Sequence, residues 1–503
     1  MRRLVLLFLL LSTTRLFAAT PVVIQYFGTP NSSNTGVSLS SSFTIHVPLA
    51  RAAITGDSIE FCFNNAGGTV WTVQLGSETM TQGVHSAVVA GSYHNCYYLV
   101  NITGGETGIT VTHTTGSATY WGGVGWEANN ISSYDVASTC TSASGVGQAA
   151  GATATSGSIT PTVSGDWLSV YTWQYQTPQV ATNYAPVTHA NITWQLIDSQ
   201  LEIAQAMMVG QYNSTTAFTP SMTQTNNQTW SMCTDAFKTG TSGASGFPTG
   251  EVVAGEQSET ILAGGSNPSN MQITPIGNTV VVVNATAYNA YFTSVTSSPS
   301  VTWTIASRCF DSGTATEVDA FYATGLTPGT TYNIAMTLSN GSAGDSALTE
   351  FDIADGTTPN IGSAGTCNSG IFSAVSGNLN TSLTTGGGAA TNTSFVPTAA
   401  NGIVISADSV DFDTNTGTTT TGAFINMGWF SGATQTGNTA YYENDGALTY
   451  PHSSTSGVAF IYTIISSPPN TSTDVDYWSN RNLDIPQGSS SSITPPQIFA
   501  IQP

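Results

Sequence analysis

Charged side chains are scarce in this sequence of 503 residues: they make up 7% of it, against roughly a quarter in an ordinary soluble domain. Seven lysines and arginines stand against 28 aspartates and glutamates, which gives a formal net charge of −21 at pH 7. Binding to a phosphate backbone needs clustered basic residues, and here the few that exist are scattered. The composition therefore excludes nucleic acid as a partner.

Long hydrophobic runs are also missing after the first residues, since none approaches the about 18 apolar residues that a membrane-spanning helix requires. The one long run, LVLLFLLL, follows the basic residues MRR and precedes the small residues of LFAAT. This order is typical of a secretory signal peptide, and a buried N-terminal helix is the alternative. We expect residues 1–19 to be a signal peptide, and the mature protein to be secreted, extracellular or at the cell surface, and not membrane-spanning.

Strand-like runs fill the remainder of the chain. SIEFCF, GITVTH, DWLSVYTW, TVVVVNATA, YNIAMTL, GIVIS and VAFIYTII are rich in β-branched and aromatic residues and are separated by clusters of Gly, Ser, Asn and Pro. A sheet with one apolar face buries it against another layer, which predicts paired sheets. The one segment with helical character is LIDSQLEIAQAMMV, from Leu196, for which a hairpin is the alternative.

The two halves of the chain resemble each other. GDSIEFCFNNAGGTVW, from Gly56, aligns with GNTVVVVNATAYNAYF, from Gly277, and three further segments align in the same order. These are CYYLVNITGGETGITV with AFYATGLTPGTTYNIAM, STCTSASG with AGTCNSG, and TPTVSGDWLSVY with VPTAANGIVIS. The offset grows steadily, as expected when a duplicated unit gains loop residues.

The fold prediction is therefore all-β, with two tandem antiparallel β-sandwich, jelly-roll-like domains related by internal duplication. A single hydrophobic core stops growing at roughly 250 to 300 residues, which also favours two domains. The stretch TGTSGASGFPTGEVVAGEQSETILAGGSNPSN has linker composition. We place domain 1 at residues 20–240, a linker at 241–264 and domain 2 at 265–503.

These repeated motifs carry a resemblance. A G-D or G-N pair before a hydrophobic strand, a T-G-G or T-P-G turn and the strand P-T-x-x-x-G-D-W-L resemble the jelly-roll or concanavalin-like sandwich repeats of secreted bacterial proteins of low charge. Separately, GLTPGTTYNIAMTLSN, from Gly325, resembles a loop and strand of fibronectin type III domains. That likeness implies a corner at Leu326, Pro328 and Tyr332 where the tyrosine clamps the loop.

Six cysteines in an exported chain favour disulfides, and free buried cysteines are the alternative. The spacing shows no C-x-x-C or Cys/His pattern of a metal site. Cys140 and Cys367 occupy equivalent repeat positions. From this repeat logic we predict the pairs Cys96–Cys140, Cys309–Cys367 and Cys62–Cys233.

No catalytic constellation is visible. The six histidines, at positions 46, 85, 94, 113, 189 and 452, have no ligand spacing, and we expect them to be solvated or in the core. GDSI at Gly56 is similar to the start of the GDSL esterases, but its repeat GNTV has neither Asp nor Ser. A glycosidase needs two facing carboxyls. Acidic residues are too sparse to nominate a pair, and Glu60 is expected to face outward between Ile59 and Phe61.

Aromatic residues supply the binding candidates. TYWGGVGW, from Thr119, places Tyr120, Trp121 and Trp126 around three glycines, and exposed indoles stack on sugar rings. Core filling is the alternative for this group. It is the favoured interpretation for a second group on one face of DWLSVYTWQYQ, which consists of Trp167, Tyr171, Trp173 and Tyr175.

One loop has the oxygen spacing of a calcium site. DFDTNTG places Asp411, Asp413 and Asn415 at alternate positions. Gly417 lies one place too late for an EF-hand turn and no Glu follows at the twelfth position, so an ordinary polar loop is the favoured alternative. No other cofactor is implied.

The leading functional hypothesis is a secreted, non-catalytic protein for adhesion, matrix formation or weak glycan binding, in which duplicated modules gain by avidity. One alternative is a secreted carbohydrate-active enzyme whose carboxyl pair is hidden in the fold. Another is a self-associating filament subunit whose strand edges pair between chains, with TVVVVNATA as the exposed edge.

Overall fold

The structure, a computed structural model, describes β-strands throughout and no helix among the residues it covers. Those are residues 20–28, 43–49, 52–66, 70–87, 92–115, 119–143, 153–175, 184–200, 205–224, 229–240, 252–261, 269–275, 277–287, 292–310, 316–338, 345–353, 368–372, 402–412, 416–420, 425–436, 439–452, 462–466 and 476–486. Every strand pair is antiparallel, and the all-β prediction is confirmed. The segment from Leu196 forms the hairpin alternative, β15 (Gln195–Gln200) with β16 (Gln205–Tyr212).

Residues 23–128, here block 1, form two sheets. The strands are β1 (Val23–Gly28), β2 (Phe43–Pro48), β3 (Ser58–Ala66), β4 (Val70–Leu75), β5 (Glu78–Thr79), β6 (Thr81–Ala87), β7 (Ser92–Val100), β8 (Gly108–Thr115) and β9 (Thr119–Ala128). The larger sheet has the order β1-β9-β3-β7-β6 and the smaller β2-β8-β4-β5. Ile59, Phe61 and Phe63 on one face of β3 pack against Val73 and Val111 of the smaller sheet.

Residues 131–239, here block 2, also form two sheets. The strands are β10 (Ile131–Ala137), β11 (Thr141–Ala143), β12 (Thr153–Thr155), β13 (Asp166–Tyr175), β14 (Tyr184–Pro186), β15, β16, β17 (Ser221–Gln224) and β18 (Thr229–Thr239). The larger sheet has the order β10-β18-β13-β16-β15, with β11 beside β18, and the smaller β12-β17-β14. Leu168 and Val170 of β13 join Met222 of β17 in the core between them.

Residues 252–353 are block 3 and residues 368–486 are block 4. Block 3 contains β19 (Val252–Ile261), β20 (Ser269–Ile273), β21 (Thr279–Ala287), β22 (Phe292–Ser298), β23 (Trp303–Phe310), β24 (Thr316–Thr324), β25 (Tyr332–Leu338) and β26 (Asp345–Ile353). Block 4 contains β27 (Asn368–Phe372), β28 (Gly402–Phe412), β29 (Thr416–Thr420), β30 (Ile425–Thr436), β31 (Thr439–His452), β32 (Tyr462–Ser466) and β33 (Asp476–Pro486).

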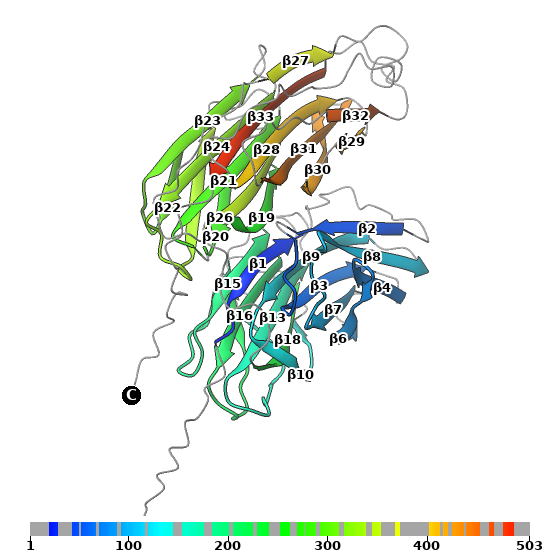
Figure 1. The fold of residues 1–503 in the computed structure, drawn as a ribbon, viewed down its shortest axis with the longest axis vertical. Helices are drawn as coiled ribbons and strands as arrows, with labels where there is room; N and C mark the ends of the chain where they lie inside the picture. The colour runs from blue at the N-terminus through cyan, green and yellow to red at the C-terminus, as the bar shows by residue number, and fades with distance from the viewer. Residues whose placement is uncertain are drawn as a thin grey trace, which may run out of the picture.

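The order of strands recurs from block to block. The larger sheets of blocks 3 and 4 read β19-β26-β21-β24-β23 and β27-β33-β28-β31-β30, and the smaller ones β20-β25-β22 and β29-β32. Counted along block 3, the larger sheet is first, last, third, sixth and fifth strand, and blocks 1 and 2 give the same order when the short strands β5 and β11 are left out of the count. In block 4 the larger sheet is first, last, second, fifth and fourth of the described strands. Figure 1 shows blocks 1 and 2 in the lower body and blocks 3 and 4 in the upper.

Two predictions about strand positions differ from the structure. The stretch predicted as a linker, 241–264, contains β19, which pairs along its length with β26. The proposed exposed edge TVVVVNATA is β21, and it is central: β24 pairs on one side and β26 on the other. The edge prediction is wrong because β21 has a hydrogen-bonded neighbour along each edge, so its main-chain groups are already paired within the sheet.

A third core lies between the larger sheets of blocks 1 and 2. It combines Trp126 and Cys62 from block 1 with Trp167, Tyr171 and Trp173 from block 2, all buried. The prediction that these last three side chains fill a core is confirmed. Because both larger sheets also carry a smaller sheet on their other face, β3 and β13 are buried on both faces. This double covering decides where the polar side chains of those strands lie.

The corner predicted in block 3 has the expected clamp. The hydroxyl oxygen of Tyr332 accepts a hydrogen bond from the main-chain N–H of Thr327 at 3.0 Å. Leu326 and Tyr332 are buried in the same core. Gly325 and Gly329 have φ values of 74° and 76°, a left-handed conformation that glycine adopts without strain. The bond fixes the path of the chain between β24 and β25.

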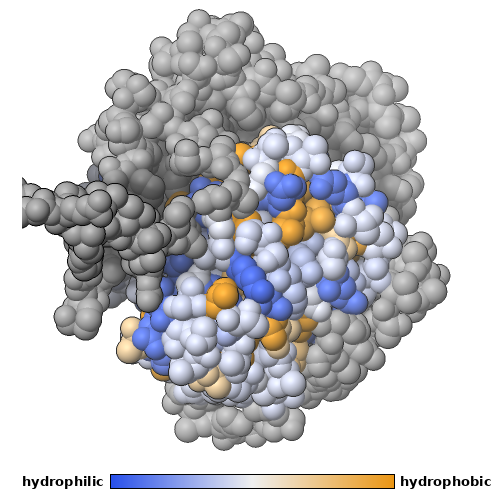
Figure 2. Space-filling view, turned by 60° about the horizontal axis from the view of Figure 1, so that its bottom comes forward, coloured by the Kyte–Doolittle hydropathy of each residue, from blue (hydrophilic) through white to orange (hydrophobic). Residues whose placement is uncertain are grey.

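The coloured part of the face in Figure 2 is mostly pale, with separate apolar patches and several strongly hydrophilic residues between them. This agrees with a surface made of Ser, Thr, Asn, Gln and Gly. Within the described residues, no helix is long and apolar enough to cross a membrane.

Candidate functional site

Both described disulfides lie in the core between the larger sheets of blocks 1 and 2. Cys62 and Cys96 face each other directly across β3 and β7 and form one of them. Cys140, just before β11, pairs with Cys233 of β18. The predicted pairs Cys96–Cys140 and Cys62–Cys233 are therefore wrong, because each cysteine bonds the nearest strand of its own block. The predicted Cys309–Cys367 pair depends on Cys367, which lies outside the described residues.

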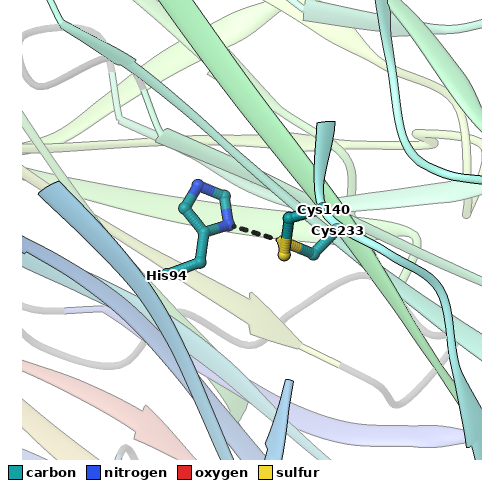
Figure 3. Close-up of side chains that lie close together, drawn as sticks. All are labelled: His94, Cys140 and Cys233. Atoms are coloured by element: carbon teal, nitrogen blue, oxygen red, sulfur yellow. Dashed lines mark hydrogen bonds between the residues drawn. A yellow bond between two sulfur atoms is a disulfide. The ribbon is translucent and has the colours of Figure 1, made fainter. Parts of the chain in front are cut away.

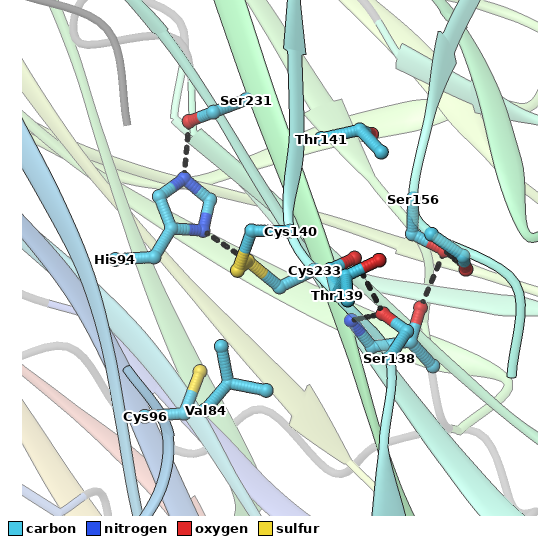
Figure 4. Close-up of a disulfide and its surroundings, with 12 residues drawn as sticks. Val84, His94, Cys96, Ser138, Thr139, Cys140, Thr141, Ser156, Ser231 and Cys233 are labelled. Atoms are coloured by element: carbon cyan, nitrogen blue, oxygen red, sulfur yellow. Dashed lines mark hydrogen bonds between the residues drawn. A yellow bond between two sulfur atoms is a disulfide. The ribbon is translucent and has the colours of Figure 1, made fainter. Parts of the chain in front are cut away.

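His94 of β7 lies against the second disulfide (Figure 3). Its Nδ1 is 3.1 Å from Sγ of Cys233, and its Nε2 hydrogen-bonds the hydroxyl of Ser231. Figure 4 shows that these groups come from facing strands, with Val84 and Cys96 beside them. The imidazole thus bridges the larger sheets of the two blocks.

Burial sets the chemistry of this histidine. His94 is fully buried, and desolvation lowers its pKa to about 3, so the ring is neutral at physiological pH. Its ring nitrogen and the two cysteine sulfurs lie within 4.8 Å of one another, close enough to share a metal ion. A metal needs deprotonated thiolates, however, and here the two sulfurs are bonded to each other. In this oxidised form the cluster is a buried contact and not a metal centre.

A pair of carboxylic acids occupies the same core. Glu60 of β3 and Asp235 of β18 are 0% and 2% exposed, and their carboxyls hydrogen-bond each other. The indole N–H of Trp126 donates to Glu60 Oε2 at 2.8 Å and is also 2.9 Å from the Ser169 hydroxyl. The hydroxyl of Tyr134 donates to Asp235 Oδ1 at 2.5 Å. Glu60 was expected to face outward, and that expectation is wrong because β3 is covered on both faces.

Both acids are hard to ionise. Desolvation and the charge of Asp235 raise the pKa of Glu60 well above its usual value. Desolvation raises the pKa of Asp235 to about 6, while hydrogen bonds from Tyr134 and Glu60 oppose the shift. Burial and the charge of Asp235 also raise the pKa of Tyr134, so its hydroxyl stays protonated as a donor. Ionisation of both acids at once is therefore unfavourable.

A second acid pair lies within the larger sheet of block 2. Asp166 of β13 is buried; desolvation and then Asp135 raise its pKa to about 7. Asp135 of β10 is different: although desolvation acts to raise its pKa, hydrogen bonds from Thr162, Asp166 and Lys238 lower it to about 2. Thr162 donates its main-chain N–H at 2.7 Å, and the Lys238 ammonium is 3.2 Å from Asp135. One acid is therefore charged and the other holds a proton near neutral pH.

Of the three predicted glycan-binding residues, the structure describes the side chain of Trp126. Trp126 is fully buried with its N–H bonded to Glu60, so its ring is unavailable to a sugar. Tyr120 and Trp121 belong to β9, but their side chains lie outside the described residues, and glycan binding by them stays a prediction. For the calcium prediction, Asp411 is placed only as a backbone position in β28, and Asp413 and Asn415 lie outside the described residues.

The sequence contained a signal for the buried acids that the outward assignment overlooked. Asp166 and Asp235 both lie in strands dense in large aromatic residues, DWLSVYTW and TWSMCTDAF. A strand with this many large aromatic residues is covered on at least one face, and an acid buried there needs a partner. The partner itself is distant in sequence and only the fold identifies it.

Comparison with protein-family models and with curated proteins finds no match for this chain.

Proposed function

We propose that this chain is a secreted, non-catalytic protein of repeated β-sandwich modules that acts by contact, in adhesion, in a matrix or in weak glycan binding. One observation carries the proposal: the acid pair and the histidine that the fold brings together between blocks 1 and 2 are enclosed in the core. Glu60, Asp235 and His94 are each at most 2% exposed. A general acid or base must come within hydrogen-bond reach of its substrate, which these groups do not.

The repeated strand order supports a finer description of the fold. With the short strands β5 and β11 left out of the count, blocks 1 to 3 have the first, last, third and sixth strands in one sheet and the second, seventh and fourth in the other, and this is a jelly-roll arrangement. The aligned sequence segments fall on equivalent strands. Gly56 precedes β3 as Gly277 precedes β21, and Tyr98 lies in β7 as Tyr322 lies in β24. We infer duplication of a two-block unit whose own blocks share one connectivity.

Secretion agrees with the disulfides, which persist in oxidising compartments. Repetition agrees with a binding role, because linked modules raise overall affinity without a new kind of contact. Tyr120 and Trp121, at the start of β9, remain the candidates for stacking on a neutral glycan.

A glycan array probed with the full chain and with Trp121→Ala tests this function. Val163→Ala is the matched control, since Val163 is 43% exposed and lies in another block. We expect the wild type and the control to bind a shared set of glycans and Trp121→Ala to lose them. Equal binding by Trp121→Ala would remove the assigned site.

The enzyme alternative is tested on the same glycans by measuring release of reducing ends. We expect no release. Release that disappears in Asp235→Asn would show that the buried acid pair is catalytic and would overturn the proposal.

A further inference from the structure

We propose that Glu60 and Asp235 form a proton-dependent latch between blocks 1 and 2: one shared proton holds the two larger sheets together in acid, and its loss weakens their contact as pH rises. This goes beyond the proposed function and does not depend on it. The two carboxyls come from different sheets, β3 in block 1 and β18 in block 2, so the bond between them crosses the interface.

The geometry requires the proton. Glu60 Oε1 receives no hydrogen bond from any N–H or O–H group among the described residues, while the carboxyl as a whole hydrogen-bonds Asp235. Two carboxylate oxygens are both acceptors, so they form a hydrogen bond only when one carries a proton. Glu60 Oε2 accepts a hydrogen bond from the indole N–H of Trp126, and Asp235 Oδ1 accepts one from the hydroxyl of Tyr134. The arrangement is complete with one proton and one negative charge.

The described side chains that face the two carboxyls from the neighbouring strands are neutral. From β10 and β7, Tyr134 and Tyr98 face Asp235, and burial raises the pKa of both, so they stay neutral. From β9 comes the indole N–H of Trp126, which donates to Glu60, and from β13 the neutral hydroxyl of Ser169, which accepts from the same N–H. From β6 comes the main-chain N–H of Val84, 3.4 Å from Asp235 Oδ2.

The sulfurs nearest Glu60 belong to the disulfide Cys62–Cys96 and do not titrate. Besides desolvation, the groups that shift the pKa values of the two acids most are each other and neutral hydrogen-bond partners: Ser169 and Trp126 for Glu60, and Tyr134 and the main chain of Val84 for Asp235.

The consequence follows from proton linkage. Both acids bind protons more tightly in the folded chain than in the unfolded chain. Their contribution is therefore fully present below about pH 4 and is lost as pH rises through their folded values. Over each pH unit in which the folded pair keeps a proton that the unfolded chain has lost, the folding constant falls about tenfold. When pH is high enough to ionise both Glu60 and Asp235, two negative charges lie next to each other between the larger sheets and repel.

Glu60→Gln and Asp235→Asn test the latch, because each amide imitates the protonated acid and can donate to the remaining carboxylate. The urea midpoint of the full chain is measured from pH 5 to pH 9. We expect each variant to become more stable relative to the wild type as pH rises. The ratio of the variant's folding constant to that of the wild type should grow several-fold or more across this range. Glu78→Gln, the same change at a partly exposed carboxyl of β5, should follow the wild type.

A second readout reports the interface directly. The rate at which a phosphine reduces Cys140–Cys233, which lies between the sheets, is compared in wild type and Glu60→Gln at each pH, so that the reagent's own pH dependence cancels. We expect the wild-type rate to exceed that of the variant increasingly above pH 7. Midpoints and rates that stay parallel across the range would overturn the proposal. So would failure of both amide variants to fold at pH 5, since it would show that the pair needs charge and not a proton.

Discussion

The two described disulfides should stabilise the chain by unequal amounts. Cys140–Cys233 closes a loop with a sequence separation of 93, and Cys62–Cys96 one with a separation of 34. In the chain-entropy description, cross-links over loops of these lengths are worth about 4.6 and about 3.8 kcal/mol at 25 °C. Each loop lies within a single block, so the two effects should add.

The perturbation is a pair of double variants, Cys140→Ala with Cys233→Ala, and Cys62→Ala with Cys96→Ala. Urea unfolding followed by tryptophan fluorescence measures the loss of unfolding free energy in each. We expect the first double variant to lose ~0.9 kcal/mol more than the second, the difference in loop-closure entropy.

Differences in packing oppose this order. Cys62, Cys96 and Cys233 are buried while Cys140 is only half-buried, so truncation should leave more empty volume at the short-loop pair. A larger loss from the Cys62–Cys96 variants would therefore refute the reasoning from loop length. It would assign most of the disulfide contribution to packing between the larger sheets.

Two further predictions concern single side chains. Tyr332→Phe removes the hydroxyl that accepts a hydrogen bond from the main-chain N–H of Thr327, and it should lower the unfolding free energy by about 1 kcal/mol. Tyr322→Phe is the control. An unchanged urea midpoint in Tyr332→Phe would show that this hydrogen bond contributes nothing to stability. Asp166→Asn should raise the melting temperature at pH 8 more than at pH 5, because the raised pKa of Asp166 makes its contribution disappear as pH rises from about 4 to about 7. An equal change at both pH values, measured by differential scanning calorimetry, would contradict the shared proton with Asp135.

Local patterns predicted the strands and part of the core. Alternation along DWLSVYTWQYQ placed Trp167, Tyr171 and Trp173 on one face, and that face is buried. The local resemblance of GLTPGTTYNIAMTLSN to fibronectin type III domains implied the clamp by Tyr332, and the hydrogen bond is present. These features depend on neighbours a few residues apart, which the period of a strand and the chemistry of a turn determine.

Features that depend on which sheets face each other were not predictable in this way. The alternation in SIEFCF correctly separates Ile59 and Phe61 from Glu60, but it assumes that the second face meets water. A smaller sheet covers one face of β3 and block 2 covers the other. The cysteine pairs failed for a related reason: equivalent repeat positions do not indicate which strand is adjacent, and Cys62 faces Cys96 directly across the ladder.

The scarcity of basic residues connects the composition to the buried acids. A chain with seven lysines and arginines has few cations to place beside a carboxylate, and a buried ionised acid without a partner is costly. Block 2 uses one of them, Lys238, for Asp135, and leaves Asp166 to hold a proton. The hydrogen-bond partners that the described residues give Glu60 and Asp235 are neutral, and in our proposal a shared proton takes the place of the cation. In this protein the proton replaces the cation, and the contact between blocks 1 and 2 becomes sensitive to pH.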